Sequence, residues 1–106
     1  MSKQDETKFK EKVLPELTAI PRTWWVKTQQ VSISGTPDIL GCVNGIFVAL
    51  ELKAKKGSPS KLQEYNIKLI NDCYGFGFVV YPQNWDGILR KIKELADDKF
   101  YTRRTK

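Results

Sequence analysis

The chain has 106 residues, of which 18 are lysine or arginine and 12 are aspartate or glutamate, so its net charge is +6. This length favours a single domain, and the positive excess favours an anionic partner such as nucleic acid. Histidine is absent from the sequence, which excludes a Ser-His-Asp triad, a Cys-His pair and a histidine-ligated metal. Any general base is therefore a carboxylate, a lysine, a tyrosine or a metal-bound hydroxide.

A helix is predicted over residues 5–19, and a strand is predicted over residues 23–34. Apolar residues in the first segment recur at spacings of three and four, which is typical of one buried helix face. Pro15 interrupts this pattern, so we expect it to kink or end the helix. The second segment, TWWVKTQQVSIS, is rich in aromatic and β-branched residues, which favour strands.

Two further strands are predicted over residues 38–43 and 46–53. They are joined by Asn44-Gly45, the strongest short-range signal for a β-hairpin. The second of these strands, IFVALELK, is apolar on both faces at its centre, so we expect it in the interior of the sheet.

The remaining elements are a basic loop, a helix, a strand and a final helix. Ser60 and Gln63 match a capping box at the start of the first of these helices. The predicted ranges are 54–59 for the loop, 60–72 for the helix, 76–81 for the strand and 85–97 for the final helix. The order α-β-β-β-α-β-α indicates an α/β or α+β domain with a mixed sheet, formed by residues 1–98 and followed by a basic tail at 99–106.

The two cysteines, Cys42 and Cys73, stand apart in apolar segments of the sequence. We expect both thiols to be small core residues of a protein in the reducing cytoplasm. No apolar segment resembles a signal peptide or reaches the length of a membrane span, so we expect no membrane partner.

Two carboxylates are expected to meet across the predicted hairpin. Asp38 lies six residues before Asn44, and Glu51 lies six residues after Gly45. Hairpin arms of equal length place Asp38 opposite Glu51 on neighbouring strands. Because side chains alternate along a strand, Lys53 points the same way as Glu51.

Two carboxylates that face each other coexist readily when a hard divalent cation lies between them. We therefore expect Mg²⁺ or Mn²⁺ at Asp38 and Glu51, with the backbone carbonyl of Leu52 as a further oxygen ligand. Such an ion polarises a phosphoryl oxygen and lowers the pKa of bound water. Lys53 is then placed to orient the attacking water or to stabilise developing charge. The basic residues Lys55, Lys56 and Lys61 are expected to contact the phosphate backbone.

Pro37-Asp38, twelve intervening residues and Glu51-x-Lys53 resemble the motif of the PD-(D/E)XK nuclease superfamily. A longer set of residues resembles the VRR-NUC group of that superfamily; it consists of Gly35-x-Pro37-Asp38-Ile39, Glu51-Leu52-Lys53, Gly57, Ser60 and Gln63. The resemblance runs from the first helix to the fourth strand. It implies a restriction-endonuclease-like αβββαβ core with an additional C-terminal helix.

The resemblance also implies roles for individual residues. Gln63 would help to position water, metal or the scissile phosphate, and Ser60 would lie with the basic residues that meet nucleic acid. An acid on the first helix would complete the site; Glu6 fits best, and Glu11 is the alternative. Members of this size resemble phage-encoded nucleases that cut branched DNA, such as four-way junctions or flaps, as homodimers in the cytoplasm of the host cell.

The leading hypothesis is therefore a Mg²⁺- or Mn²⁺-dependent DNA endonuclease. One alternative is a module with the same fold that binds nucleic acid without cutting it. Another is a phage protein that inhibits or recruits a host enzyme through its tryptophans and its basic tail. Trp24 and Trp25 suit the core, a dimer interface or DNA stacking, whereas for Trp85 on the final helix we expect core packing in preference to dimerisation.

Overall fold

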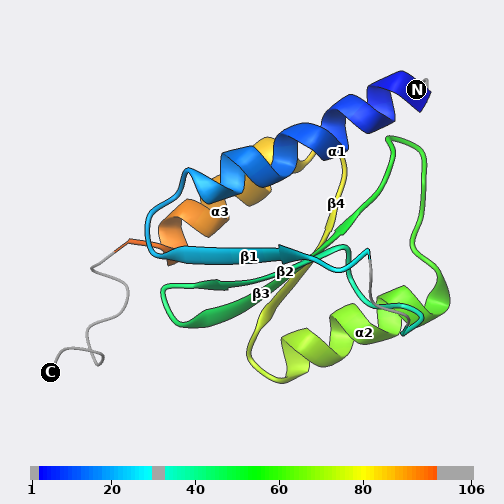
Figure 1. Cartoon of the computed structure of the whole chain (residues 1–106). Coiled ribbons are helices and arrows are strands. Elements are labelled where there is room, and N and C mark those ends of the chain that lie inside the picture. The colour runs from blue at the N-terminus through cyan, green and yellow to red at the C-terminus, as the bar shows by residue number, and fades with distance from the viewer. Residues whose placement is uncertain (1–2, 30–32, 98–106) are drawn as a thin grey trace, which may run out of the picture.

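Helices and strands follow one another in the order predicted from the sequence, α-β-β-β-α-β-α (Figure 1). The computed structural model describes residues 3–29 and 33–97, with the side chains from residue 7 onwards. The predicted tail at 99–106 lies outside these residues. The elements are α1 (Lys3–Thr18), β1 (Thr23–Lys27), β2 (Ile39–Val43), β3 (Ile46–Leu52), α2 (Lys61–Asp72), β4 (Phe76–Val80) and α3 (Trp85–Leu95).

The four strands form one mixed sheet in the order β1-β2-β3-β4. The pairs β1–β2 and β2–β3 are antiparallel, and β4 runs parallel to β3. The predicted α+β class with a mixed sheet is therefore confirmed. β3 is paired on both sides, as its apolar sequence indicated.

The hairpin between β2 and β3 turns at Asn44-Gly45, as predicted. Asn44 has φ 52° and Gly45 has φ 87°, and two positive values are what a type I′ turn requires. The side chain of Asn44 donates hydrogen bonds to the carbonyls of Leu95 at 3.2 Å and Asp97 at 3.0 Å. The tip of the hairpin is thus fastened to the end of α3.

α1 and α3 cover one face of the sheet, and α2 lies against the other (Figure 1). α1 continues through Pro15 to Thr18, so this proline does not end the helix.

Trp85 is 1% exposed, and its Nε1 donates a 2.9 Å hydrogen bond to Oε1 of Glu16, which confirms the core role predicted for this tryptophan. The largest apolar side chains that are fully buried are Leu17, Ile39, Leu50, Trp85, Ile92 and Leu95. Among the described residues, no helix combines the length and apolar character needed to cross a membrane.

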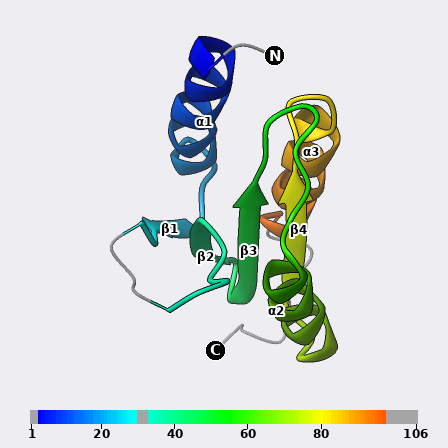
Figure 2. The ribbon, with the colours of Figure 1, turned by 90° about the vertical axis from the view of Figure 1, so that its right-hand side faces the viewer.

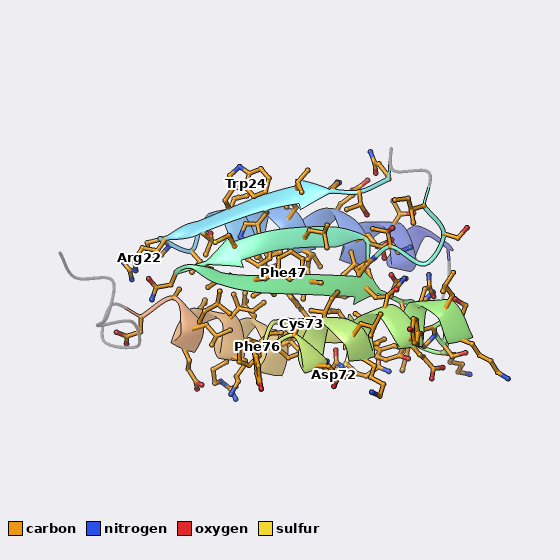
Figure 3. The ribbon with its side chains drawn as sticks, turned by 90° about the horizontal axis from the view of Figure 1, so that it is seen from below. Arg22, Trp24, Phe47, Asp72, Cys73 and Phe76 are labelled. Atoms are coloured by element: carbon orange, nitrogen blue, oxygen red, sulfur yellow. The ribbon has the colours of Figure 1, made fainter. Side chains whose placement is uncertain are left out.

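The second face of the sheet is only partly covered. α2 packs on the β4 side and leaves β1 and β2 open (Figure 3). Trp24, Cys42 and Phe47 lie side by side on this open face, because Trp24 pairs with Cys42 in β2 and Cys42 with Phe47 in β3. All three are exposed.

The prediction that both cysteines lie in the core was wrong. Cys42 alternates with Gly41 and Val43, whose positions face the core, so its own side chain points to the open face. Cys73 caps the end of α2 and is also exposed. Apolar neighbours in the sequence do not bury a thiol when the sheet face it occupies has no covering layer.

β1 is shorter than the strand predicted over residues 23–34. It ends at Lys27, and residues 30–32 lie outside the described part of the chain. The backbone amide of Thr28 donates a 2.9 Å hydrogen bond to the carbonyl of Asp38, and its hydroxyl donates one to the carbonyl of Pro37. The chain is therefore held to the start of β2 at the point where β1 ends.

Candidate active site

Asp38 and Glu51 lie beside each other at one end of the sheet. The register pairs Ile39 with Leu50, so the preceding Asp38 falls opposite Glu51, the arrangement that the hairpin spacing predicted. The backbone amide of Leu52 donates a 2.8 Å hydrogen bond to Oδ2 of Asp38. This bond fixes the carboxylate of Asp38 against the end of β3.

Glu51 is a buried carboxylate with an unsatisfied oxygen. Its residue is 2% exposed, and no hydrogen-bond donor in the described part of the chain reaches its Oε1. Its other oxygen, Oε2, lies 3.4 Å from Nζ of Lys53. An ionised group buried with half of its hydrogen-bonding capacity unused is costly unless something compensates it.

The electrostatics of Glu51 follow from this position. Burial raises the pKa of its carboxyl, and the nearby charge of Asp38 raises it further. Lys53, and more weakly Lys10 of α1, act in the opposite direction and lower the pKa. The net effect is a raised pKa, so the site favours any positive charge that can reach the free oxygen of Glu51.

The donor set can be compared with what a divalent cation requires. Among the described residues, no cluster of three or more acidic or cysteine side chains surrounds one point. Mg²⁺, however, is commonly held by one or two carboxylates together with water and substrate phosphate. Asp38 and Glu51 meet that requirement, and the unpaired oxygen of Glu51 is the observation that fits a cation there.

Glu6 and Glu11 are the two acids predicted as candidates on the first helix. Glu6 lies within α1, but its side chain is outside the described residues. Glu11 is exposed. The side chain that α1 is seen to bring near the carboxylates is Lys10.

The basic loop follows directly from the site. The amide of Lys53 donates to the carbonyl of Val80 at 2.8 Å, which holds the end of β3 to β4. The segment after β3 then extends beyond the sheet on the side where α1 begins (Figures 1 and 2). The side chain of Gln83 donates to the carbonyl of Lys55 at 2.9 Å. The predicted nucleic-acid contacts on and after this loop are all exposed: Lys55, Lys56, Ser60 and Lys61.

Gln63 takes part in the capping box predicted from the sequence. Its side-chain Oε1 accepts a 2.8 Å hydrogen bond from the backbone amide of Ser60. The backbone amide of Gln63 in turn donates a 3.2 Å hydrogen bond to Oγ of Ser60. These are the hydrogen bonds seen for Gln63. They account for the residue as the start of α2, and a role at the carboxylates remains a prediction.

Three polar residues near Asp38 were not predicted from the sequence. Lys10, Lys27 and Gln29 line a cavity of about 160 Å³ together with Asp38, Ile39 and Leu52. Lys10 comes from α1, and Lys27 and Gln29 come from the end of β1 and the residues after it. No local motif marks these residues, because only the packing of α1 on β1 and the pairing of β1 with β2 bring them together.

Comparison of the chain with protein-family models, with curated proteins and with solved structures finds no match.

Proposed function

We propose that this chain is a metal-dependent endodeoxyribonuclease, with Mg²⁺ or Mn²⁺ held by Asp38 and Glu51. The observation that carries the proposal is the carboxylate of Glu51, which is almost fully buried beside a second carboxylate and whose Oε1 has no hydrogen-bond partner among the described residues. A protein keeps such a group at a cost in stability, and functional sites are where such costs are found.

The site residues have distinct tasks in this proposal. Asp38 and Glu51 supply oxygen ligands, with the carbonyl of Leu52 as a further ligand. A divalent cation bound there would activate a water molecule and polarise a phosphoryl oxygen. Lys53, 3.4 Å from Oε2 of Glu51, would position the attacking water or neutralise charge that develops on the phosphate. Glu6 and Gln63 are proposed as outer members of the site, on the resemblance to VRR-NUC nucleases alone.

The proposed substrate is DNA. The net charge of +6 favours a polyanion, and Lys55, Lys56, Ser60 and Lys61 lie on or after the loop that extends from the site. Selectivity for branched DNA, a homodimer and action in the cytoplasm follow from the resemblance to VRR-NUC nucleases. Two active sites related by a two-fold axis would suit symmetric cleavage of a four-way junction.

The test is a cleavage assay on linear, flap and four-way junction DNA with Mn²⁺, with the cut positions read on sequencing gels. We expect branched DNA to be cut, EDTA to abolish cutting, and Asp38→Ala to be inactive. Asp86→Asn is the matched control, because Asp86 is an exposed acid in the first turn of α3. Undiminished cutting by Asp38→Ala would refute the proposed site.

A DNA-binding module that does not cut is the second candidate. The ion pair between Lys53 and Glu51 favours it, because a lysine can partly neutralise the buried charge without a metal. Calorimetric titration with Mn²⁺ discriminates between the two. The nuclease should bind the ion in a manner that depends on Asp38 and Glu51, and the non-cutting module should show no such binding.

A further inference from the structure

The cavity beside Asp38 has a composition that differs from that of the proposed metal site. Its polar lining residues are Lys10, Lys27, Gln29 and Asp38. Two lysines and one aspartate give these residues a net positive charge. Such a lining is unsuited to a second cation and suited to an anion.

The position of this lining is set by the backbone. Lys27 pairs with Ile39 in the register of β1 and β2, next to Asp38. The intervening Thr28 is tied to the carbonyls of Pro37 and Asp38, so Lys27 and Gln29 are held on either side of a fixed residue. Lys27 therefore shares the sheet face of the buried Ile39, the face that α1 covers. Gln29 lies in the turn after β1, and Lys10 comes from α1; both line the same cavity as Lys27.

We propose that this cavity binds a phosphate of the DNA strand immediately next to the phosphate that is cut, with Lys10 and Lys27 as its charged contacts and Gln29 as a neutral donor. The inference rests on the proposed function, because it uses Asp38 as the shared wall between the cavity and the metal site. Both lysines donate hydrogen bonds to phosphate oxygens as compact positive charges. The amide of Gln29 adds a donor without adding charge.

The size of the cavity agrees with this ligand. A volume of about 160 Å³ admits one phosphate group with some water. A phosphate held there would fix the register of the strand relative to Asp38 and Glu51. Contacts of this kind set position along the backbone and carry no base specificity.

The experiment measures DNA binding without cutting. The affinity of the full chain for a four-way junction with 5′-hydroxyl ends is determined in EDTA over a range of salt concentrations. The proteins compared are the wild type, Lys10→Gln, Lys27→Gln, their double variant and Lys27→Arg. Lys91→Gln is the matched control, because Lys91 is an exposed lysine on α3 away from the cavity. Thermal unfolding verifies that each variant is folded.

Loss of one phosphate contact should reduce the steepness of the dependence of log affinity on log salt by about 0.9. We expect that reduction for the double variant, retention of the wild-type slope by Lys27→Arg, and no change for Lys91→Gln. Junctions with one neutral methylphosphonate near the mapped cut site then locate the contact. Replacement next to the cut should weaken binding by the wild type and leave binding by the double variant unchanged.

The outcomes separate this inference from the proposed function. If the wild type binds and cuts but the double variant keeps the wild-type salt slope, the phosphate site is refuted and the nuclease proposal stands. The phosphate site is also refuted, and the nuclease proposal stands, if the methylphosphonate that weakens binding lies elsewhere in the strand. A wild-type chain that neither binds nor cuts DNA overturns both.

Discussion

The backbone amide of Leu52 donates a 2.8 Å hydrogen bond to Oδ2 of Asp38, so the end of β3 orients a side chain that precedes β2. The same carboxylate is proposed to bind a cation. Its contribution to stability and its contribution to catalysis can therefore be separated by the choice of substitution.

Asp38→Ala removes the acceptor of the Leu52 amide, whereas Asp38→Asn retains an oxygen for it. We expect Asp38→Ala to lower the free energy of unfolding by about 1–3 kcal/mol, and Asp38→Asn to cost less. Both variants should lose metal-dependent cutting, because neither supplies a charged ligand. Denaturation with urea and the Mn²⁺ cleavage assay measure the two effects. Equal stability of the two variants would contradict a structural role for the bond to Leu52.

Glu51→Gln is expected to stabilise the metal-free protein at neutral pH. Burial, and then the charge of Asp38, raise the pKa of Glu51 from its ordinary 4.5. The folded state then binds the proton more tightly than the unfolded chain, so stability falls as the pH rises from the unfolded pKa through the folded one. Above that window the full cost of the buried charge is present, and the glutamine avoids it.

The measurement is thermal unfolding in EDTA at pH 5 and pH 8. The melting temperature of Glu51→Gln should exceed that of the wild type at pH 8, and the difference should shrink at pH 5. About 1 kcal/mol corresponds to some 4–8 °C for a domain of this size. Mn²⁺ should raise the melting temperature of the wild type and leave that of Glu51→Gln nearly unchanged. A Glu51→Gln variant less stable than the wild type at pH 8 would show that the ionised carboxylate of Glu51 does not destabilise the folded protein.

Lys53→Gln should reduce cutting by about 10²-fold or more while DNA binding stays within a few-fold. The reason is that Nζ of Lys53 lies against Glu51, with its side chain only 21% exposed, and is therefore poorly placed to hold DNA. Lys68→Gln, at an exposed lysine paired with Asp72 on α2, is the control. Single-turnover cleavage and fluorescence anisotropy give the two quantities. A parallel loss of binding and cutting would assign Lys53 to DNA contact.

Gln63 can be tested against its role in the capping box. Gln63→Ala removes the acceptor for the amide of Ser60 and should cost about 1 kcal/mol, whereas Gln63→Glu retains an acceptor and should cost little. Urea denaturation provides the comparison. If both variants also cut DNA slowly when fully folded, Gln63 has a chemical role in addition to the cap.

Most of the fold that was predicted correctly follows from short sequence signals at turns and helix starts. Asn44-Gly45 fixed the hairpin, and Ser60 with Gln63 fixed the start of α2, since each acts through backbone groups a few residues away. The meeting of Asp38 and Glu51 followed from the same turn. Features set by distant packing were not predicted, because the sequence near them contains no corresponding signal.

Two errors illustrate that limit. β1 ends at Lys27, although β-branched residues continue beyond it in the sequence. Cys42 is exposed because α2 leaves its part of the sheet uncovered.

The turn at Asn44-Gly45 also constrains how this chain can diverge. The arms on its two sides are matched in length between Asp38 and Glu51, and the tip is fastened to α3 through Asn44. A one-residue insertion or deletion in a single arm would turn one of the two acids to the opposite face of the sheet. Relatives can therefore exchange residues within the arms but should conserve their length, and gains or losses of residues should accumulate in the loop at 54–59.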